Sequence, residues 1–227
     1  MDSMYAQILR STLGPKKYEY SDLCYYFTQK ILEKQIGQKQ NIYLEKQIYR
    51  PMGLRYMRYL PLEHFDKSHI IPTENDQAFR KQLLHGFVHD PGAAMLGGVA
   101  GHAGIFANAT DLASVMQLFL NKGKYAGMEF FSESVCNEYT KQQFAGNRRG
   151  AGFDRPNASG GGTCDELASS QSFGHSGFTG TLAWADPKNK VIFIFLSNRV
   201  NPSQDNWKIR DMNIRTRIQH VIYQSLQ

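Results

Sequence analysis

The sequence predicts an α+β fold in which helices surround a short antiparallel sheet. The stretch 172–200 predicts three short strands in a meander, because turn-forming residues such as Pro187 and Asn189 separate its apolar runs. Its last run, Val191–Leu196, is apolar at every position and rich in β-branched and aromatic side chains. Such a run is typical of a strand covered on both faces. Elsewhere, apolar residues recur at helical spacing in several segments.

Two helices are predicted in the first forty residues. The first covers Met4–Leu13. The second begins at Ser21 or Asp22, either of which can cap a helix N-terminus, and runs to about Gln35 before Gly37 stops it. Its predicted buried stripe is Leu23, Phe27 and Ile31.

The next part of the chain alternates between a helix and irregular segments. Residues 41–49 predict a short helix, and residues 55–84 are polar and interrupted by prolines, so we expect loops with at most one helical turn. The stretch 84–106 combines six glycines with apolar residues. Glycine at this density disfavours a continuous helix, and a packed, irregular loop is predicted instead.

Three more helices are predicted: one from Asn108 or Thr110 to Gly123, one from Ser132 to Lys141, and one that begins at Asp205 or Asn206. Between the second and the sheet, residues 145–171 are rich in glycine, serine and asparagine, which predicts a mobile surface excursion. The apolar stripe predicted for the last helix is Ile214, Ile218, Val221 and Ile222.

Composition narrows the function classes. No run of 18 apolar residues exists, so the sequence predicts no membrane-spanning helix. The formal charge of +6 would permit nucleic-acid binding, but the basic residues are scattered and no recognition motif accompanies them, so we expect no nucleic-acid partner. The three cysteines lie far apart, which does not fit a disulfide framework.

A metal site is one alternative to weigh. His85 and His89 are spaced as on one helix face, Asp90 follows, and His102 is nearby, so together they could ligate zinc in a metal-dependent hydrolase. However, no glutamate separates the first two histidines, and Pro91 interrupts a helix at this point. We favour packed loop histidines and expect neither a metal nor another cofactor.

Three stretches of the sequence, taken in their order along the chain, resemble elements of a known family. Tyr20-Ser21-Asp22 precedes an amphipathic helix and the sequence PMGL. GGVAGHAGIFANATDLASVMQLFLNKGK runs from a glycine-rich loop into a capped helix, and GHSGFTGTLAWADPKNKVIFIFLSNRV opens on His175-Ser176-Gly177. Together they resemble the serine hydrolases of the β-lactamase and penicillin-binding-protein class, near the class C enzymes and related esterases. The resemblance implies a β-lactamase/transpeptidase-like fold.

The resemblance also implies roles for particular residues. Acyl transfer needs a nucleophilic hydroxyl, a base and donors for the oxyanion. In the family, a tyrosine beside the lysine of the nucleophile motif serves as the base, and a Lys-Thr-Gly strand lines the substrate. The matching positions here are Tyr20 and His175 as catalytic residues, and Asp22, Ser176, Gly177 and the backbone of Phe178 and Thr179 as substrate-binding residues.

Three departures qualify the implied activity. Asp22 replaces the family's asparagine, so an amide donor becomes a carboxylate acceptor, which disfavours β-lactam recognition. His175 replaces the lysine of the strand motif. No serine in the chain is followed by lysine three residues later, so the family's Ser-x-x-Lys nucleophile is missing from these residues. We expect an ester, amide or peptidoglycan-like substrate and no activity from this chain alone. A non-catalytic binding or structural relative is the alternative.

The family's domain contains more than these residues, because its nucleophile motif and two further strands precede the tyrosine element. We therefore expect residues 1–227 to be the C-terminal portion of one domain, with helices and loops over 20–170 and strands plus a helix over 171–227. The strand at 191–196 would then present a bare edge, through which we expect a homodimer. The family's exported relatives imply a periplasmic or cell-envelope location.

Overall fold

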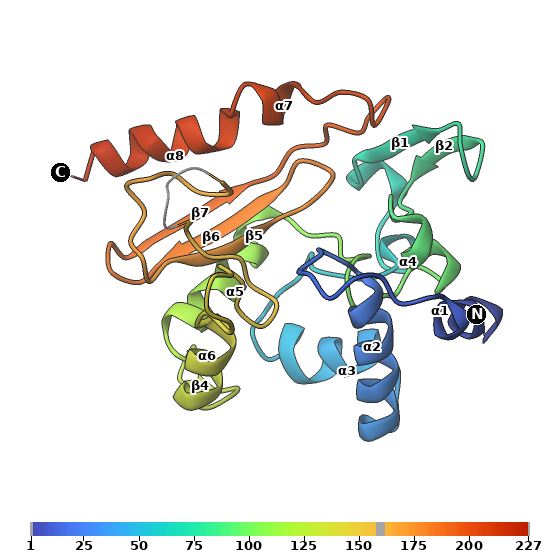
Figure 1. The fold of residues 1–227 in the computed structure, drawn as a ribbon, viewed down its shortest axis with the longest axis horizontal. Helices are drawn as coiled ribbons and strands as arrows, with labels where there is room; N and C mark the ends of the chain where they lie inside the picture. The colour runs from blue at the N-terminus through green and yellow to red at the C-terminus, as the bar shows by residue number, and fades with distance from the viewer. Residues whose placement is uncertain (1, 158–161, 227) are drawn as a thin grey trace.

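The computed structural model describes residues 2–157 and 162–226, and its fold is α+β as predicted (Figure 1). A three-stranded sheet with a helix on each face lies beside a region of helices and loops. The helices are α1 (Asp2–Arg10), α2 (Leu23–Ile36), α3 (Gln40–Leu44), α4 (Pro91–Met95), α5 (Ala109–Leu120), α6 (Glu133–Thr140), α7 (Lys208–Asp211) and α8 (Ile214–Gln224), with the π-helix η1 (Glu45–Tyr49) and the 3-10 helices η2 (Pro61–Glu63) and η3 (Lys67–His69). The strands are β1 (Pro72–Asp76), β2 (Gln82–His85), β3 (Lys124–Tyr125), β4 (Met128–Glu129), β5 (Phe173–Ser176), β6 (Leu182–Asp186) and β7 (Val191–Phe195).

The main sheet is the predicted antiparallel meander, in the order β5-β6-β7. His175 of β5 pairs with Ala183 of β6, and Asp186 of β6 pairs with Val191 of β7. The β5–β6 turn depends on Gly180, whose φ of 106° is in a region that side-chain-bearing residues rarely adopt. This turn carries the residues that follow the His-Ser-Gly motif.

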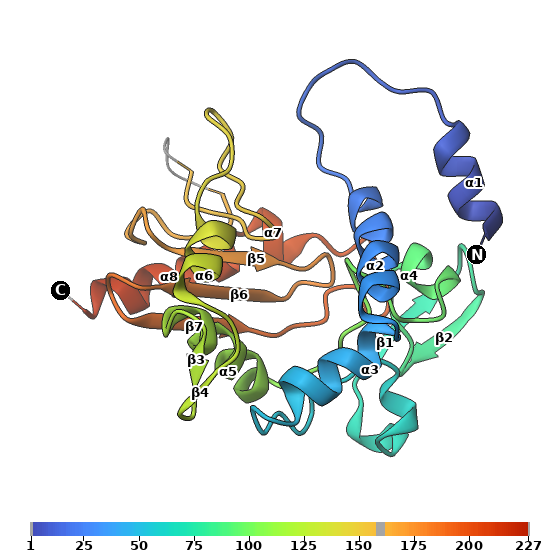
Figure 2. The same cartoon turned by 90° about the horizontal axis from the view of Figure 1, so that it is seen from below.

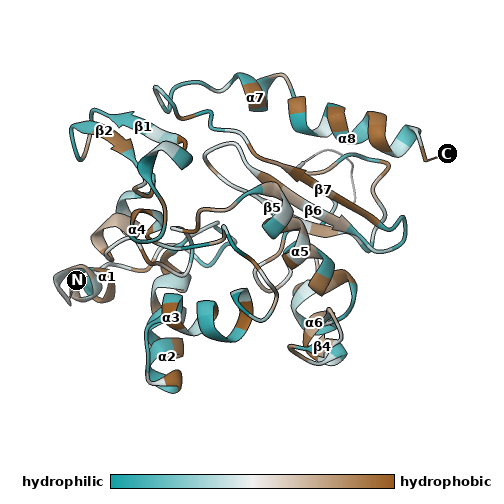
Figure 3. Ribbon diagram, turned by 180° about the vertical axis from the view of Figure 1, so that it is seen from behind, coloured by the Kyte–Doolittle hydropathy of each residue, from teal (hydrophilic) through white to brown (hydrophobic). Residues whose placement is uncertain are grey.

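Helices cover both faces of the sheet, with α5 on one and α8 on the other (Figure 1). The apolar side chains toward α5 are Phe173, Ala183, Ala185, Ile192 and Ile194. Those toward α8 are Leu182, Trp184, Phe193 and Phe195. Double coverage explains why β7 is apolar at every position (Figure 3). Only Phe193 is fully buried, however, because β7 is the outermost strand of the sheet.

The helix predicted near residues 22–35 is present as α2, but its predicted buried stripe is wrong for two of its three residues, since only Phe27 packs against the core. Leu23 and Ile31 are 43% and 58% exposed, whereas Tyr26 and Gln29 are buried. The reason is that α2 packs against a glycine-rich loop. The Gln29 side-chain amide donates to the Val99 carbonyl at 2.9 Å, so the helix buries a polar side chain that satisfies loop backbone.

Two hairpins occur outside the predicted strands, and the first of them lies where the sequence predicts loops. One is β1–β2, within residues 72–85, and the other is the short pair β3–β4. Strand β1 has the sequence PTEND, which lacks the apolar alternation that identifies strands. Tertiary contacts hold it instead, since the Asn198 amide donates to the carbonyls of Pro72 and Thr73 at 2.6 and 2.9 Å.

The surface excursion predicted for residues 145–171 is wrong for part of its length. Asp154 is only 2% exposed, and its backbone exchanges two hydrogen bonds with Gly174, extending the sheet beyond β5. Cys164 is also buried, in the core beneath the sheet. Residues 158–161 lie outside the described residues. The buried Asp154 carboxylate accepts from Arg148 and Thr163, which ties these described parts of the segment together.

The remaining helices lie where they are predicted, except that the last one is divided in two and buries a different face. Asn108 and Ser132 cap α5 and α6 through their side chains, and Gly37 ends α2 in the left-handed conformation. The last predicted helix is divided into α7 and α8. Of its predicted stripe, Ile218 and Val221 are exposed, and α8 buries Gln219 and Tyr223 instead. No helix in the described residues is long and apolar enough to span a bilayer.

Candidate functional site

The Tyr20 and His175 side chains lie together although 155 positions separate them. Tyr20 is in the connection between α1 and α2, and His175 is near the end of β5. Their ring centroids are 6.2 Å apart. Figure 2 shows this connection and residues 145–157 reaching out on the same side of the molecule. The tyrosine element and the His-Ser-Gly element therefore meet at one site.

An arginine that the sequence does not single out joins these two elements. The Arg149 guanidinium lies over the Tyr20 ring, 5.1 Å from its centroid, and its Nε donates to the Tyr18 hydroxyl at 3.0 Å. Its Nη1 is 3.0 Å from Nε2 of His175. Arginine can only donate, so Nε2 of His175 must accept, and the ring proton is on Nδ1, which donates to the Ser176 carbonyl at 2.8 Å. His175 is thus neutral in this geometry, and Arg149 supplies the positive charge.

A buried carboxylate holds Arg149 in place. Asp154 accepts two hydrogen bonds from Arg148, at 2.6 and 3.2 Å, and one from Thr163 at 2.6 Å. Arg149 Nη1 is 3.6 Å from the same carboxylate. Burial opposes ionisation of Asp154, but the hydrogen bonds from Arg148 and Thr163 and the charges of both arginines keep its pKa below the ordinary value. Asp154 therefore ties the segment that carries Arg149 to the start of β5.

The Tyr20 phenol remains protonated in this environment. Its pKa is raised by partial burial, by the charge of the Asp22 carboxylate and by a hydrogen bond to that carboxylate, and the Arg149 charge only partly opposes these effects. A tyrosine can serve as a base only when neighbouring cations lower its pKa. The described residues alone do not provide that environment.

The other predicted substrate-binding residues lie along the end of β5 and its turn. Ser176 pairs with Leu182 of β6, and the Gly177 amide donates to the Thr181 carbonyl at 2.9 Å. In the described part of the chain, the amides of Phe178 and Thr179 donate to no protein group. No serine hydroxyl among the described residues hydrogen-bonds to Tyr20 or His175.

The three histidines considered as metal ligands each have a different partner, and for His102 that partner is Asp90. His85 Nε2 contacts the Ile70 carbonyl, and His102 Nε2 is 2.7 Å from Asp90. His89 Nδ1 is 2.6 Å from Glu74, and its ring stacks on Phe178 with centroids 5.0 Å apart. Across residues 2–157 and 162–226, no cluster of three or more His, Cys, Asp or Glu side chains is arranged to hold a metal ion. Within these ranges, the three rings serve packing and hydrogen bonding.

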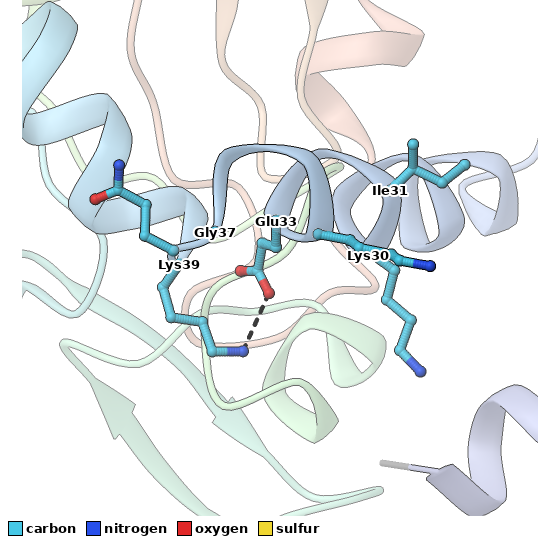
Figure 4. A pocket seen from close by; sticks show the side chains of 7 residues that line it. Lys30, Ile31, Glu33, Gly37 and Lys39 are labelled. Atoms are coloured by element: carbon cyan, nitrogen blue, oxygen red, sulfur yellow. Dashed lines mark hydrogen bonds and ion pairs between the residues drawn. The ribbon is translucent and has the colours of Figure 1, made fainter.

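A surface hollow lies away from this site, along α2 (Figure 4). It has a volume of about 600 Å³ and is lined by Ile31 and by lysines, one of which, Lys39, pairs with Glu33 at 3.0 Å. Neither Tyr20 nor His175 contributes to it. Its lining residues include no hydroxyl or thiol that could act as the nucleophile of acyl transfer.

Sequence reasoning missed Arg149 and Tyr18. The signal was present only as the pair Arg148-Arg149, which by itself is indistinguishable from scattered surface charge. The two arginines differ in structure, because Arg148 makes the paired contact with Asp154 and Arg149 turns toward His175. That division depends on a carboxylate five and six positions further on, which no local pattern reveals.

Comparison with known proteins identifies the family of this chain. The family model described as Beta-lactamase matches residues 2–213, and the chain belongs to the beta-lactamase family. A protein of Escherichia coli strain K12, provisionally named D-alanyl-D-alanine carboxypeptidase, is 36% identical over 196 residues, which are 81% of this chain and 45% of that protein. A Salmonella paratyphi B protein with the same provisional name is 34% identical over 206 residues, 85% of this chain and 48% of its own length. The chain spans about half the length of these relatives.

Solved structures show the same fold. A beta-lactamase of Mycobacterium bovis superposes with a TM-score of 0.63 at 18% identity, covering 91% of this chain and 64% of its own. A penicillin-binding-protein homologue of Caulobacter crescentus gives a TM-score of 0.59 at 22% identity, with 87% and 58% covered. The predicted β-lactamase/transpeptidase-like fold is therefore confirmed.

Proposed function

We propose that this chain forms the substrate-binding half of a serine-hydrolase site that acts on peptides ending in D-alanyl-D-alanine. The relatives' provisional names suggest this substrate, and it belongs to the peptidoglycan-like class expected from the sequence. The chain contains no Ser-x-x-Lys, so turnover requires that a nucleophile be supplied by other residues.

The observation that carries this proposal is the position of Arg149 between the two motif elements. A peptide substrate of this class ends in a carboxylate, which a guanidinium binds through charge-assisted hydrogen bonds. The Arg149 side chain is 23% exposed, so part of it is accessible to a ligand. Arg149 lies against Tyr20 and His175. A peptide whose terminal carboxylate binds Arg149 would therefore have its scissile bond close to these two residues.

The roles of the other residues follow from this placement. Tyr20 would take the proton of the nucleophilic hydroxyl once a lysine beside it lowers the phenol pKa. His175 is neutral and contacts Arg149, so it would not supply a positive charge to the site. Its role would be to hold the end of β5 in position through its contact with Arg149. Ser176 and Gly177 would line the peptide, and the free amides of Phe178 and Thr179 would donate to the oxyanion. Asp22 would hold the Tyr20 hydroxyl before reaction.

A non-catalytic relative is the second candidate, and the absence of Ser-x-x-Lys from these residues is equally compatible with either function. Such a protein would use the same residues to bind the peptide without cleaving it. The coding sequence upstream of Met1 distinguishes the two, since only the enzyme needs a Ser-x-x-Lys there.

Replacing Arg149 with methionine is expected to weaken binding of N-acetyl-D-alanyl-D-alanine roughly tenfold to a hundredfold, as for the loss of one charge-assisted hydrogen-bond set. Binding is measured by NMR titration of the 227-residue chain. The C-terminal amide of the same peptide should bind the wild type as weakly as the acid binds the variant. Arg50→Met is the matched control, because Arg50 is 73% exposed and pairs only with Glu45. Equal binding of the acid and the amide by the wild type would contradict the proposal.

We also propose that the chain dimerises through β7, with a second copy as the occupant of the strand edge. A two-fold axis would pair Val191–Phe195 with itself in antiparallel fashion, and this strand contains no charge to oppose the pairing. Light scattering after size exclusion should give about twice 25.8 kDa. Leu196→Lys, at a position 39% exposed beside the strand, should shift the chain toward the monomer. A monomer at every concentration would refute this proposal.

A further inference from the structure

The turn between β5 and β6 is held by its carbonyl groups. Nε of Arg199 donates to the Phe178 carbonyl at 2.7 Å, and the Arg199 backbone amide donates to the Thr179 carbonyl at 2.8 Å. The next two carbonyls, of Gly180 and Thr181, accept from Ser197 Oγ at 2.9 Å and Arg215 Nη1 at 3.0 Å. Four successive carbonyls thus face the segment after β7 and the helix α8.

This arrangement determines where the amides of the turn point. In a trans peptide the carbonyl and the following amide hydrogen point in opposite directions. The Phe178 carbonyl points to Arg199, so the Thr179 amide points away from it. The Gly177 carbonyl accepts from the Gly180 amide inside the turn at 3.0 Å, so the Phe178 amide points outward. Both amides are without a protein acceptor among the described residues.

Arg199 is an unusual residue for a purely structural role. It is only 6% exposed, and no carboxylate forms an ion pair with it among the described residues. Its guanidinium lies between two aromatic rings, 4.3 Å from the Phe178 centroid and 3.7 Å from that of Trp207. Burial and the nearby Arg210 and Arg215 lower its pKa. A buried cation without a counter-ion is costly, so its placement calls for a compensating role.

The contacts of Arg199 show what that role is. Besides the turn, its Nη1 donates to the carbonyls of Gln204 and Asn206 at 2.6 and 3.1 Å. The side chain thereby fixes the turn to the segment before α7. Hydrogen bonds to the carbonyl of a peptide also polarise its amide, which strengthens that amide as a donor.

We propose that Arg199 is a positioning residue, which orients the amides of Phe178 and Thr179 as a paired donor for the carbonyl oxygen of a bound peptide. This inference rests on the proposed function for the identity of the ligand. The orientation of the amides, in contrast, can be measured without any ligand.

The first experiment compares backbone ¹⁵N relaxation in the wild type, Arg199→Met and Arg199→Lys. In the wild type, the amides of Phe178 and Thr179 should have order parameters near about 0.85, and in Arg199→Met values below about 0.6. Arg199→Lys keeps the charge but cannot reach all three carbonyl partners of the side chain, those of Phe178, Gln204 and Asn206, so an intermediate value is expected. Arg210→Met is the control, because the Arg210 side chain stacks on Trp207 and pairs with Asp211 but, among the described residues, makes no hydrogen bond to the turn. Unchanged order in a folded Arg199→Met or Arg199→Lys protein would overturn the inference.

The second experiment adds N-acetyl-D-alanyl-D-alanine to the same proteins. In the wild type, the amide protons of Phe178 and Thr179 should move downfield on saturation, and Arg199→Lys or Arg199→Met should lose that shift and bind at least about tenfold more weakly. A wild type that does not bind the peptide defeats the proposed function, while the relaxation result still decides the role of Arg199. Equal binding and equal shifts in the variants defeat the positioning role alone.

Discussion

Asp154→Asn is expected to lower the free energy of unfolding by about 3–5 kcal/mol, the usual cost of breaking a buried ion pair. The Asp154 side chain is 3% exposed and accepts from Arg148, Thr163 and the Arg155 amide. Asparagine has the same shape but turns a donor toward Arg148, which leaves that cation without its partner. The measurement is urea unfolding of the variant and the wild type at neutral pH.

The pH dependence of this effect gives a second readout. The Asp154 pKa is lowered in the folded state, so the stability it contributes is present above the unfolded carboxyl value of about 3.9 and is lost as the pH falls below it. The difference between wild type and variant should therefore shrink on acidification. Asp211→Asn is the matched control, because its pair with Arg210 is exposed on both sides. A difference that is small at neutral pH, or that persists unchanged in acid, would contradict this account of Asp154.

Trp184→Ala is the second large effect, with an expected loss of about 3–5 kcal/mol from the cavity it leaves. Trp184 is 0% exposed and lies at the centre of the sheet, on the face toward α8. Its neighbours on that face include Leu182 and Phe193, which β-pairing prevents from collapsing into the space. The thermal midpoint of unfolding measures the change.

Two further variants sharpen this test. Trp184→Phe keeps most of the volume and removes an indole N–H that has no partner among the described residues, so its cost should be below about 1.5 kcal/mol. Phe144→Ala removes an aromatic ring that is 72% exposed and should leave the midpoint near that of the wild type. A mild effect of Trp184→Ala would mean that the sheet face is not the main core.

The sheet could be predicted from the sequence because its signals are local. Pro187 and Asn189 mark a turn, and the apolar run of β7 follows from coverage on both faces. Helix faces were harder to predict, as α2 and α8 illustrate. Each buries a glutamine that bonds to loop backbone, Gln29 to Val99 and Gln219 to the Asp165 amide. Which face packs is decided by the partner surface, and hydropathy alone does not contain that information.

The site was predictable only where a motif carries it. Tyr20 and His175 were identified through the order of the family elements, and the structure brings them together. Arg149 was not identifiable, since its role arises from contacts with residues 26 and 131 positions away. The structure also shows that the positive charge of the site does not come from the His-Ser-Gly motif. Where the family's strand carries a lysine, this chain has a neutral histidine, and the cation comes from a different segment.

The measurement that tests the central claim most directly is intact mass after incubation with a fluorophosphonate and, separately, with a penicillin. The claim is that these residues form the binding half of the site and contain no activated nucleophile. We expect no gain in mass from either probe, in the same preparation that binds N-acetyl-D-alanyl-D-alanine. A stoichiometric adduct would contradict the claim, because a serine within these residues, with Ser21 and Ser176 the first to be mapped, would then have to be activated.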